Sequence, residues 1–193
     1  MNFKGHAFGG GITGIGVAGL AVFSGVIPVT PELLKQIMNA PLQHMNPVSI
    51  LLSIFAITWF MSLFPDLDTA SVPQRWFFRI MLIILGILYV KRQMDLFALV
   101  AFSVLLPVIH KHRGWTHWKI TPWLVSVFLA IVYEYFRVQE AWFASFSWHN
   151  VLAFLKQYWI FVVGCVAGHY THLFLDSRSV KWLPFIANST NHH

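Results

Sequence analysis

Charged residues are scarce in this sequence. Asp, Glu, Lys and Arg make up 10% of the 193 residues, whereas 57% of the residues are hydrophobic. Soluble domains contain about 25% charged and 45–50% apolar residues, so this composition excludes an ordinary soluble domain. The sequence therefore predicts an all-α integral membrane protein, built as a bundle of about six helices.

Cysteine is nearly absent. Cys165 is the single cysteine, so an intramolecular disulfide is excluded. The lack of paired cysteines also argues against a structural zinc site built from thiolates. The sequence contains no convincing internal repeat, no low-complexity linker and no sign of a second domain. We therefore expect one membrane-embedded helical domain over residues 1–193.

Acidic residues are fewer than basic ones, which gives a net charge of +6. A basic protein can bind nucleic acid, but here the cations are scattered at the ends of apolar runs and form no basic patch. The positive-inside pattern of membrane proteins explains them more simply. We expect membrane lipids as partners and do not expect nucleic acid; the sequence does not indicate a protein partner.

Six apolar runs divide the chain. They cover residues 5–27, 48–64, 76–90, 96–109, 122–136 and 152–175. The third and fourth runs, of about 15 and 14 residues, fall short of the roughly 20 that cross a bilayer. They would either span with the help of flanking residues or form a re-entrant hairpin. Between the first two runs, residues 30–47 predict an interfacial helix.

The first apolar run has a second interpretation. Small residues around Ala18–Ala21 resemble the cleavage site of a signal peptide. A retained span is favoured because several apolar runs follow it. Its glycines fall partly at the spacing that lets another helix approach closely.

Histidine and aspartate gather at the ends of these runs. His6 opens the first run, Asp66 and Asp68 follow the second, and three histidines lie between positions 110 and 117. The last run ends in His169, His172 and Asp176. Ionisable groups near a membrane are costly and usually mark a function. Three of the seven acidic residues belong to these groups, which favours a shared site.

Counting membrane crossings places all four groups on one face, and the count survives if the two short runs re-enter. Eight of the 13 basic residues fall on that face by the same count. They are Lys4, Arg75, Arg79, Lys111, Arg113, Lys119, Arg178 and Lys181. The positive-inside rule then predicts that the site and both termini are cytoplasmic.

Imidazole and carboxylate are ligands that suit zinc, with manganese or iron as alternatives. His172 and Asp176 are four residues apart and would share one face of a helix. The expected metal ligands are His6, Asp66, Asp68, His117, His172 and Asp176. His112 is either a further ligand or lies directly behind one. The competing interpretation is a hydrogen-bonded network at helix ends without metal. His149 falls on the opposite face, among aromatic residues typical of a membrane interface.

The order of these motifs resembles the YdjM-type family, described as LexA-binding, inner-membrane-associated, predicted metal-dependent hydrolases. The matching segments are His6 in a glycine-rich run, Pro65 to Asp68, His112 to His117, Gly168 to Asp176, and Trp182 to Phe185. Family members often carry a histidine after the second aspartate, where this chain has Thr69, so any ligand role there is lost or moved. The motif does not assign His110 or His169.

The resemblance implies a multi-pass protein of the bacterial inner membrane that hydrolyses a phosphoester or other ester. The family is similar in turn to helical zinc-dependent phospholipases C and single-strand nucleases. A bound metal would activate water, with Arg113 and His112 as the expected catalytic residues, Arg113 steadying an anionic substrate. A lipid phosphoester is the preferred substrate because the site would lie at headgroup depth.

Two other functions remain open from the sequence. One is a non-catalytic membrane protein that binds a metal or a regulatory partner, whose metal shell would be full. The other is a transporter, in which His and Asp form a proton or ion path. Ligands at several depths would favour transport, whereas ligands at one end of the bundle favour hydrolysis.

Overall fold

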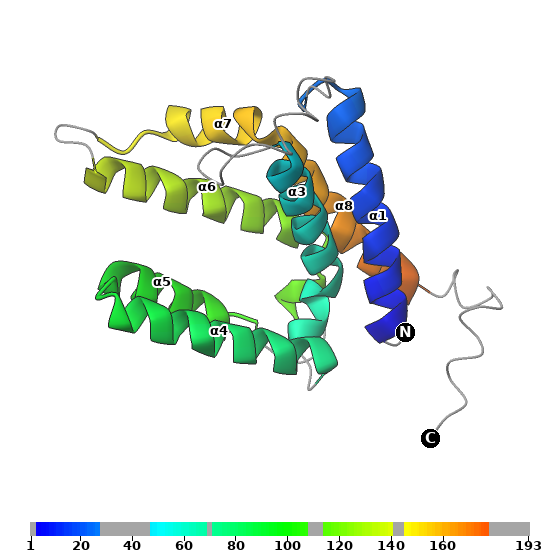
Figure 1. The fold of residues 1–193 in the computed structure, drawn as a ribbon, viewed down its shortest axis with the longest axis horizontal. Coiled ribbons are helices and arrows are strands. Elements are labelled where there is room, and N and C mark those ends of the chain that lie inside the picture. Colours follow the sequence, from blue (N-terminus) through cyan, green and yellow to red (C-terminus); the bar gives the residue numbers. More distant parts are fainter. Residues whose placement is uncertain (1–2, 28–46, 69–70, 108–113, 141–144, 178–193) are drawn as a thin grey trace.

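The computed structural model describes residues 3–27, 47–68, 71–107, 114–140 and 145–177, and within them it contains helices and no strand (Figure 1). The prediction of an all-helical protein is confirmed. The α-helices are α1 (Phe3–Phe23), α3 (Pro47–Leu63), α4 (Val72–Val90), α5 (Met94–Leu105), α6 (Thr121–Glu140), α7 (Trp148–Gln157) and α8 (Trp159–Asp176). Two short 3-10 helices are η1 (Phe64–Asp68) and η2 (Trp115–His117).

Helices α1, α3 and α8 form the centre of the fold, each packed against the other two (Figure 1). Glycines allow this close packing. A Cβ atom on Gly168 of α8 would overlap the backbone carbonyl oxygen of Thr58 in α3, and one on Gly10 of α1 would overlap the hydroxyl of Ser62. Helix α1, with Val17 and Ala21 in the core, is therefore an integral part of the bundle.

Two helix pairs extend to one side of this centre, α4 with α5 and α6 with α7 (Figure 1). The first pair follows η1 at the end of α3 and leads to η2, and the second pair leads from η2 to the start of α8. Helix α4 has 19 residues and begins earlier than the apolar run suggested, because Ser71 caps it and Pro73 occupies its first turn. Helix α5 has 12 residues, a rise of about 18 Å, too short to span alone.

The last apolar run is not one helix, contrary to the sequence-based expectation. The chain bends by 74° between α7 and α8. Tyr158, at the break, has φ −102° and ψ 29°, outside the helical region. Buried Val151 and Ile160 lie on either side of the bend, so apolar residues continue through it. Hydropathy alone therefore gave no sign of the break.

A buried carboxylate joins α6 to α7 far from the predicted site. The side chain of Glu134 accepts two hydrogen bonds from Arg137, at 2.6 and 2.7 Å. It also accepts one from the Asn150 side chain at 2.9 Å and one from the Ser147 backbone N–H at 3.2 Å. Buried charge is tolerated when it is paired and hydrogen-bonded in this way. Glu134 therefore holds α7 against α6, and we assign it a structural role.

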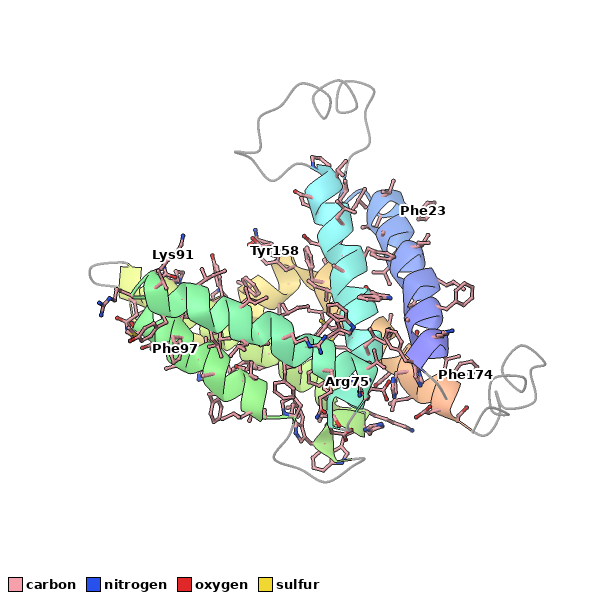
Figure 2. All side chains as sticks on the ribbon, turned by 60° about the horizontal axis from the view of Figure 1, so that its bottom comes forward. Phe23, Arg75, Lys91, Phe97, Tyr158 and Phe174 are labelled. Carbon is pink, nitrogen blue, oxygen red and sulfur yellow. The ribbon has the colours of Figure 1, made fainter. Side chains whose placement is uncertain are left out.

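The apolar helices indicate association with a membrane. Four helices in the described ranges are long and apolar enough to cross one, or five if the bent α7–α8 pair counts as a span. Large apolar side chains are exposed along α4, including Leu82 and Val90. Figure 2 shows Arg75 at one end of α4 and Lys91 at the other, and Arg79 is the one charged residue between them. The interfacial helix expected at residues 30–47 falls almost wholly outside the described residues.

Candidate metal centre

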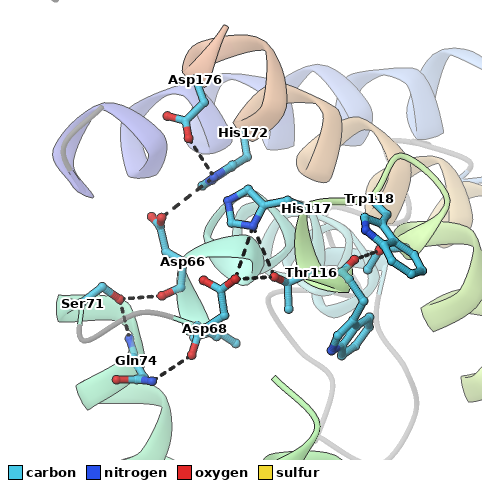
Figure 3. Close-up of polar contacts among 12 residues, drawn as sticks. Asp66, Asp68, Ser71, Gln74, Thr116, His117, Trp118, His172 and Asp176 are labelled. Atoms are coloured by element: carbon cyan, nitrogen blue, oxygen red, sulfur yellow. Dashed lines mark hydrogen bonds and ion pairs between the residues drawn. The ribbon is translucent and has the colours of Figure 1, made fainter. Parts of the chain in front are cut away.

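Four elements bring the predicted ligands to one end of the bundle. His6 lies in the first turns of α1, Asp66 and Asp68 in η1, His117 in η2, and His172 and Asp176 at the end of α8. Figure 3 shows the aspartates of η1 facing His172 and His117. We call these six residues, His6, Asp66, Asp68, His117, His172 and Asp176, the His–Asp cluster. Their role as metal ligands stays a prediction.

The closest contacts in the cluster join the start of α1 to the end of α8. Nε2 of His6 lies 3.2 Å from Oδ1 of Asp176, and Nε2 of His172 lies 3.7 Å from Oδ2 of the same carboxylate. The rings of His6 and His172 stack with centroids 4.0 Å apart and planes inclined by 17°. The expected spacing of four residues therefore does place His172 and Asp176 on one face of α8.

His172 is oriented by the backbone of α3. Its Nδ1 lies 2.9 Å from the carbonyl oxygen of Ser62, and because a carbonyl only accepts, the proton of the neutral ring is on Nδ1. Nε2 then presents a lone pair toward Asp176 and toward Asp66, whose Oδ1 is 3.9 Å away. Metal-binding histidines commonly have one nitrogen fixed by a carbonyl in this way.

Three buried imidazole nitrogens have no hydrogen-bond partner within the described part of the chain: Nδ1 of His169, outside the cluster, and two within it. The two in the cluster are Nε2 of His172 and Nδ1 of His6, and both side chains are about 99% or more buried. Buried polar atoms normally find a partner, so a network complete in itself would not leave these two. Donor atoms that share a metal with bonds of about 2.0–2.2 Å lie about 3–4 Å apart, and ligand atoms of His6, His172 and Asp176 all lie within 4.8 Å of one another. The residues present therefore fit a metal ion.

The two aspartates of η1 face different histidines. Asp66 faces His172 whereas Asp68 faces His117 (Figure 3), and their binding to one cation stays a prediction. In a 3-10 helix, residues two apart point about 120° away from each other, which explains the divergence. The turn is held by Ser71, whose hydroxyl donates to the Asp66 carbonyl at 2.7 Å, and by Gln74, whose amide donates to the Leu67 carbonyl at 3.0 Å.

Asp68 and His117 form the second part of the cluster. Oδ2 of Asp68 lies 3.5 Å from Nδ1 of His117, and the hydroxyl of Thr116 donates to the same oxygen at 2.9 Å. The ring of His117 meets the ring of His172 edge-on, with centroids 5.5 Å apart. Sequence reasoning missed Thr116, although its place next to His117 in the Gly-Trp-Thr-His segment was a signal. The ring contact between the two histidines joins both parts of the cluster.

His169 is not a member of the cluster. Its Nε2 lies 3.0 Å from the carbonyl oxygen of Trp118, just after η2, and the side chain is fully buried. Tyr170 makes a parallel contact by donating its hydroxyl to the Lys119 carbonyl at 3.1 Å. These two residues fasten α8 to the segment that carries His117. His169 is thus a positioning residue, which the sequence motif had left unassigned.

Four further residues named in the sequence analysis are not part of the cluster as the structure describes it. His112 and Arg113, the expected catalytic residues, and His110 lie outside the described residues. His149 lies at the exposed start of α7, at the far end of the bundle from the cluster (Figure 1). That position agrees with its exclusion from the ligand set.

The chain matches no protein-family model, no curated protein and no solved structure. The resemblance to the YdjM-type family therefore depends on the order of the sequence motifs alone. What the site can do has to be argued from its own geometry.

Proposed function

We propose that the chain is a membrane-bound, metal-dependent hydrolase that acts on a phosphoester or other ester at the level of the lipid headgroups. Nε2 of His172 carries the proposal. This buried nitrogen has no hydrogen-bond partner among the described residues and lies 3.7 and 3.9 Å from carboxylate oxygens of Asp176 and Asp66. Zinc accepts this donor set best, with manganese or iron as alternatives.

A divalent metal, when bound, supplies an activated water and polarises the scissile group. The chain's residues hold and orient it: the Ser62 carbonyl fixes the ring of His172, and Asp68 with Thr116 fixes His117. No nucleophilic side chain is then required. We assign to Arg113 the role of steadying an anionic substrate and to His112 a role beside the metal.

The placement of the ligands favours hydrolysis over transport. An ion path needs ionisable groups at several depths, whereas the His–Asp cluster draws its members from helix ends at one end of the bundle. Glu134, a buried carboxylate of α6 outside the cluster, is already satisfied by four hydrogen bonds. The motif order that resembles the YdjM-type family supports the same reaction class and a bacterial inner membrane.

The test is a matched pair of histidine variants on α8. We expect purified wild-type protein to carry a divalent metal and to hydrolyse a phosphodiester or a phospholipid. His172→Gln should lose the metal because an amide cannot replace the imidazole lone pair at Nε2. His169→Gln should keep it because glutamine can still donate to the Trp118 carbonyl. Elemental analysis of the three proteins, followed by a hydrolysis screen, measures both outcomes.

Three outcomes are separable. Wild-type protein without metal, or equal metal in both variants, contradicts the metal site. Metal lost only in His172→Gln, with no hydrolysis by any protein, contradicts the enzyme and supports a metal-binding regulatory protein. Loss of a residue that only orients a ligand weakens metal binding by about 10–100-fold, so titration of the metal affinity distinguishes a ligand from a residue that supports it.

We also propose that the chain crosses the membrane several times with the cluster and both termini on the cytoplasmic side. The support is that the start of α1, η1, η2 and the end of α8 all meet at the cluster, and that eight of the 13 basic residues belong to that face by the crossing count. A fluorescent protein fused after His193 should fluoresce. An alkaline phosphatase fused at the same place should stay inactive. An active phosphatase fusion would show that the C-terminus lies on the opposite side of the membrane.

A further inference from the structure

An apolar cavity lies beside the His–Asp cluster. It measures about 440 Å³, within the usual range of ligand sites of about 300–1,000 Å³. Its walls come from α1, α3, η1 and α4, and every lining side chain is apolar or aromatic. They are Phe3, Trp59, Phe60, Leu63, Leu67, Pro73, Trp76, Phe77, Ile80 and Met81.

The cavity and the cluster share their supporting segments. Leu67 lines the cavity and lies between Asp66 and Asp68 in η1. Leu63 lines it and follows Ser62, whose carbonyl accepts from His172. One molecule could therefore place an apolar part in the cavity and a polar part at the cluster.

The exposed lining of the cavity is almost entirely apolar. The indole N–H of Trp59 is used by the backbone carbonyl of Ala7, at 3.0 Å. Any polar group placed in the cavity would lose its hydrogen bonds to water without compensation. The part of a ligand that fits here is a hydrocarbon chain.

The rim of the cavity carries positive charge. Trp76 and Ile80 line the cavity and are 58% and 49% exposed, so it opens to the surface beside α4. The Arg79 guanidinium lies over the Trp76 ring, 5.8 Å from its centroid. Arg75, one helical turn earlier, is exposed at the η1 end of α4 (Figure 2). Arginine at this place complements an anionic headgroup.

We infer that the cavity holds an acyl chain of an anionic phospholipid whose headgroup lies at the His–Asp cluster. The inference rests on the proposed function, which it deepens by naming the substrate class. It follows from the apolar lining, the opening on a membrane-exposed helix, the arginines at the rim and the segments shared with the cluster. The lipid enters sideways beside α4 and reaches the cluster without leaving the membrane.

Filling the cavity tests the inference by binding alone. Met81 lines the cavity, whereas the adjacent Leu82 is 72% exposed and does not line it. We expect Met81→Trp to retain about tenfold less dioleoyl phosphatidylglycerol than wild type after exchange into detergent, because several methylene groups lose their apolar surroundings. Leu82→Trp should retain the wild-type amount. Native mass spectrometry of the intact protein counts the bound lipid.

Ile80→Trp, at the rim, serves as the second variant if Met81→Trp does not fold, with helical circular dichroism and thermal unfolding as the check of folding. Equal retention in wild type, in the folded cavity variant and in Leu82→Trp overturns the inference. So does equal retention of phosphatidylglycerol and uncharged diacylglycerol by wild type.

The failure of this inference and the failure of the proposed function can be distinguished. Asp176→Ala protein, which should lack metal and activity, should still bind the acyl chain and still lose it on Met81→Trp. Lipid retention without metal or hydrolysis in the wild type would contradict the proposed enzyme and leave the lipid site. Metal binding and hydrolysis with no retained lipid would contradict the lipid site and support the proposed enzyme.

Discussion

Asp176→Ala should lose bound metal and hydrolytic activity together, while His149→Ala should lose neither. Asp176 faces two histidines at once: Oδ1 is 3.2 Å from Nε2 of His6, and Oδ2 is 3.7 Å from Nε2 of His172. Removing the carboxylate takes an anionic donor from between them. Metal content and hydrolysis of the purified variants are the measurements.

His149 is the matched control because it is also ionisable but lies exposed at the start of α7, away from the cluster. Comparing the two variants tests the site assignment rather than tolerance to mutation. A folded Asp176→Ala protein with full metal and full activity would remove this residue from the site. A partial loss of affinity, of about 10–100-fold, would instead place it behind the ligands.

Gly168→Ala should destabilise the bundle and disturb the cluster through packing alone. The added Cβ would overlap the Thr58 carbonyl oxygen and lie 3.1 Å from Cβ of Met61, so α8 must move away from α3. Overpacking of this kind costs about 1–3 kcal/mol. One turn further along α8, His172 is bonded to the Ser62 carbonyl of α3, so the same movement pulls the ring from its support.

Gly16→Ala on α1 is the control because a Cβ there meets no atom within 4 Å. Alanine is favoured over glycine in a helix by about 1 kcal/mol, so this variant should be as stable as wild type or more so. Thermal unfolding in detergent compares the two, and metal titration then reports on the cluster. Identical unfolding temperatures for both variants would show that the α3–α8 contact is not as close as described.

The helical class of the protein and the gathering of its His and Asp residues at one end were readable from the sequence. The scarcity of charge and the long apolar runs require helices, because a chain in an apolar medium must satisfy its backbone hydrogen bonds within itself. The spacing of His172 and Asp176 predicts a shared helix face because an α-helix repeats every 3.6 residues. The even number of runs between the His- and Asp-containing segments indicated that they would meet at one end.

Tertiary structure decided which atoms face one another. Sequence spacing did not separate Asp66 from Asp68, because their divergence follows from the 3-10 turn that Ser71 and Gln74 hold. Spacing placed His172 beside Asp176 but left His169 unassigned, because the carbonyl that His169 contacts, that of Trp118, belongs to a segment distant in sequence.

The bend at Tyr158 and the apolar cavity depend on how helices pack, and apolar residues look alike in sequence whether they face a core, a cavity or lipid. The periodicity of apolar residues indicates only which face of a single helix is apolar. The contact between faces is fixed by steric fit at positions such as Gly168, which only the folded chain brings into register.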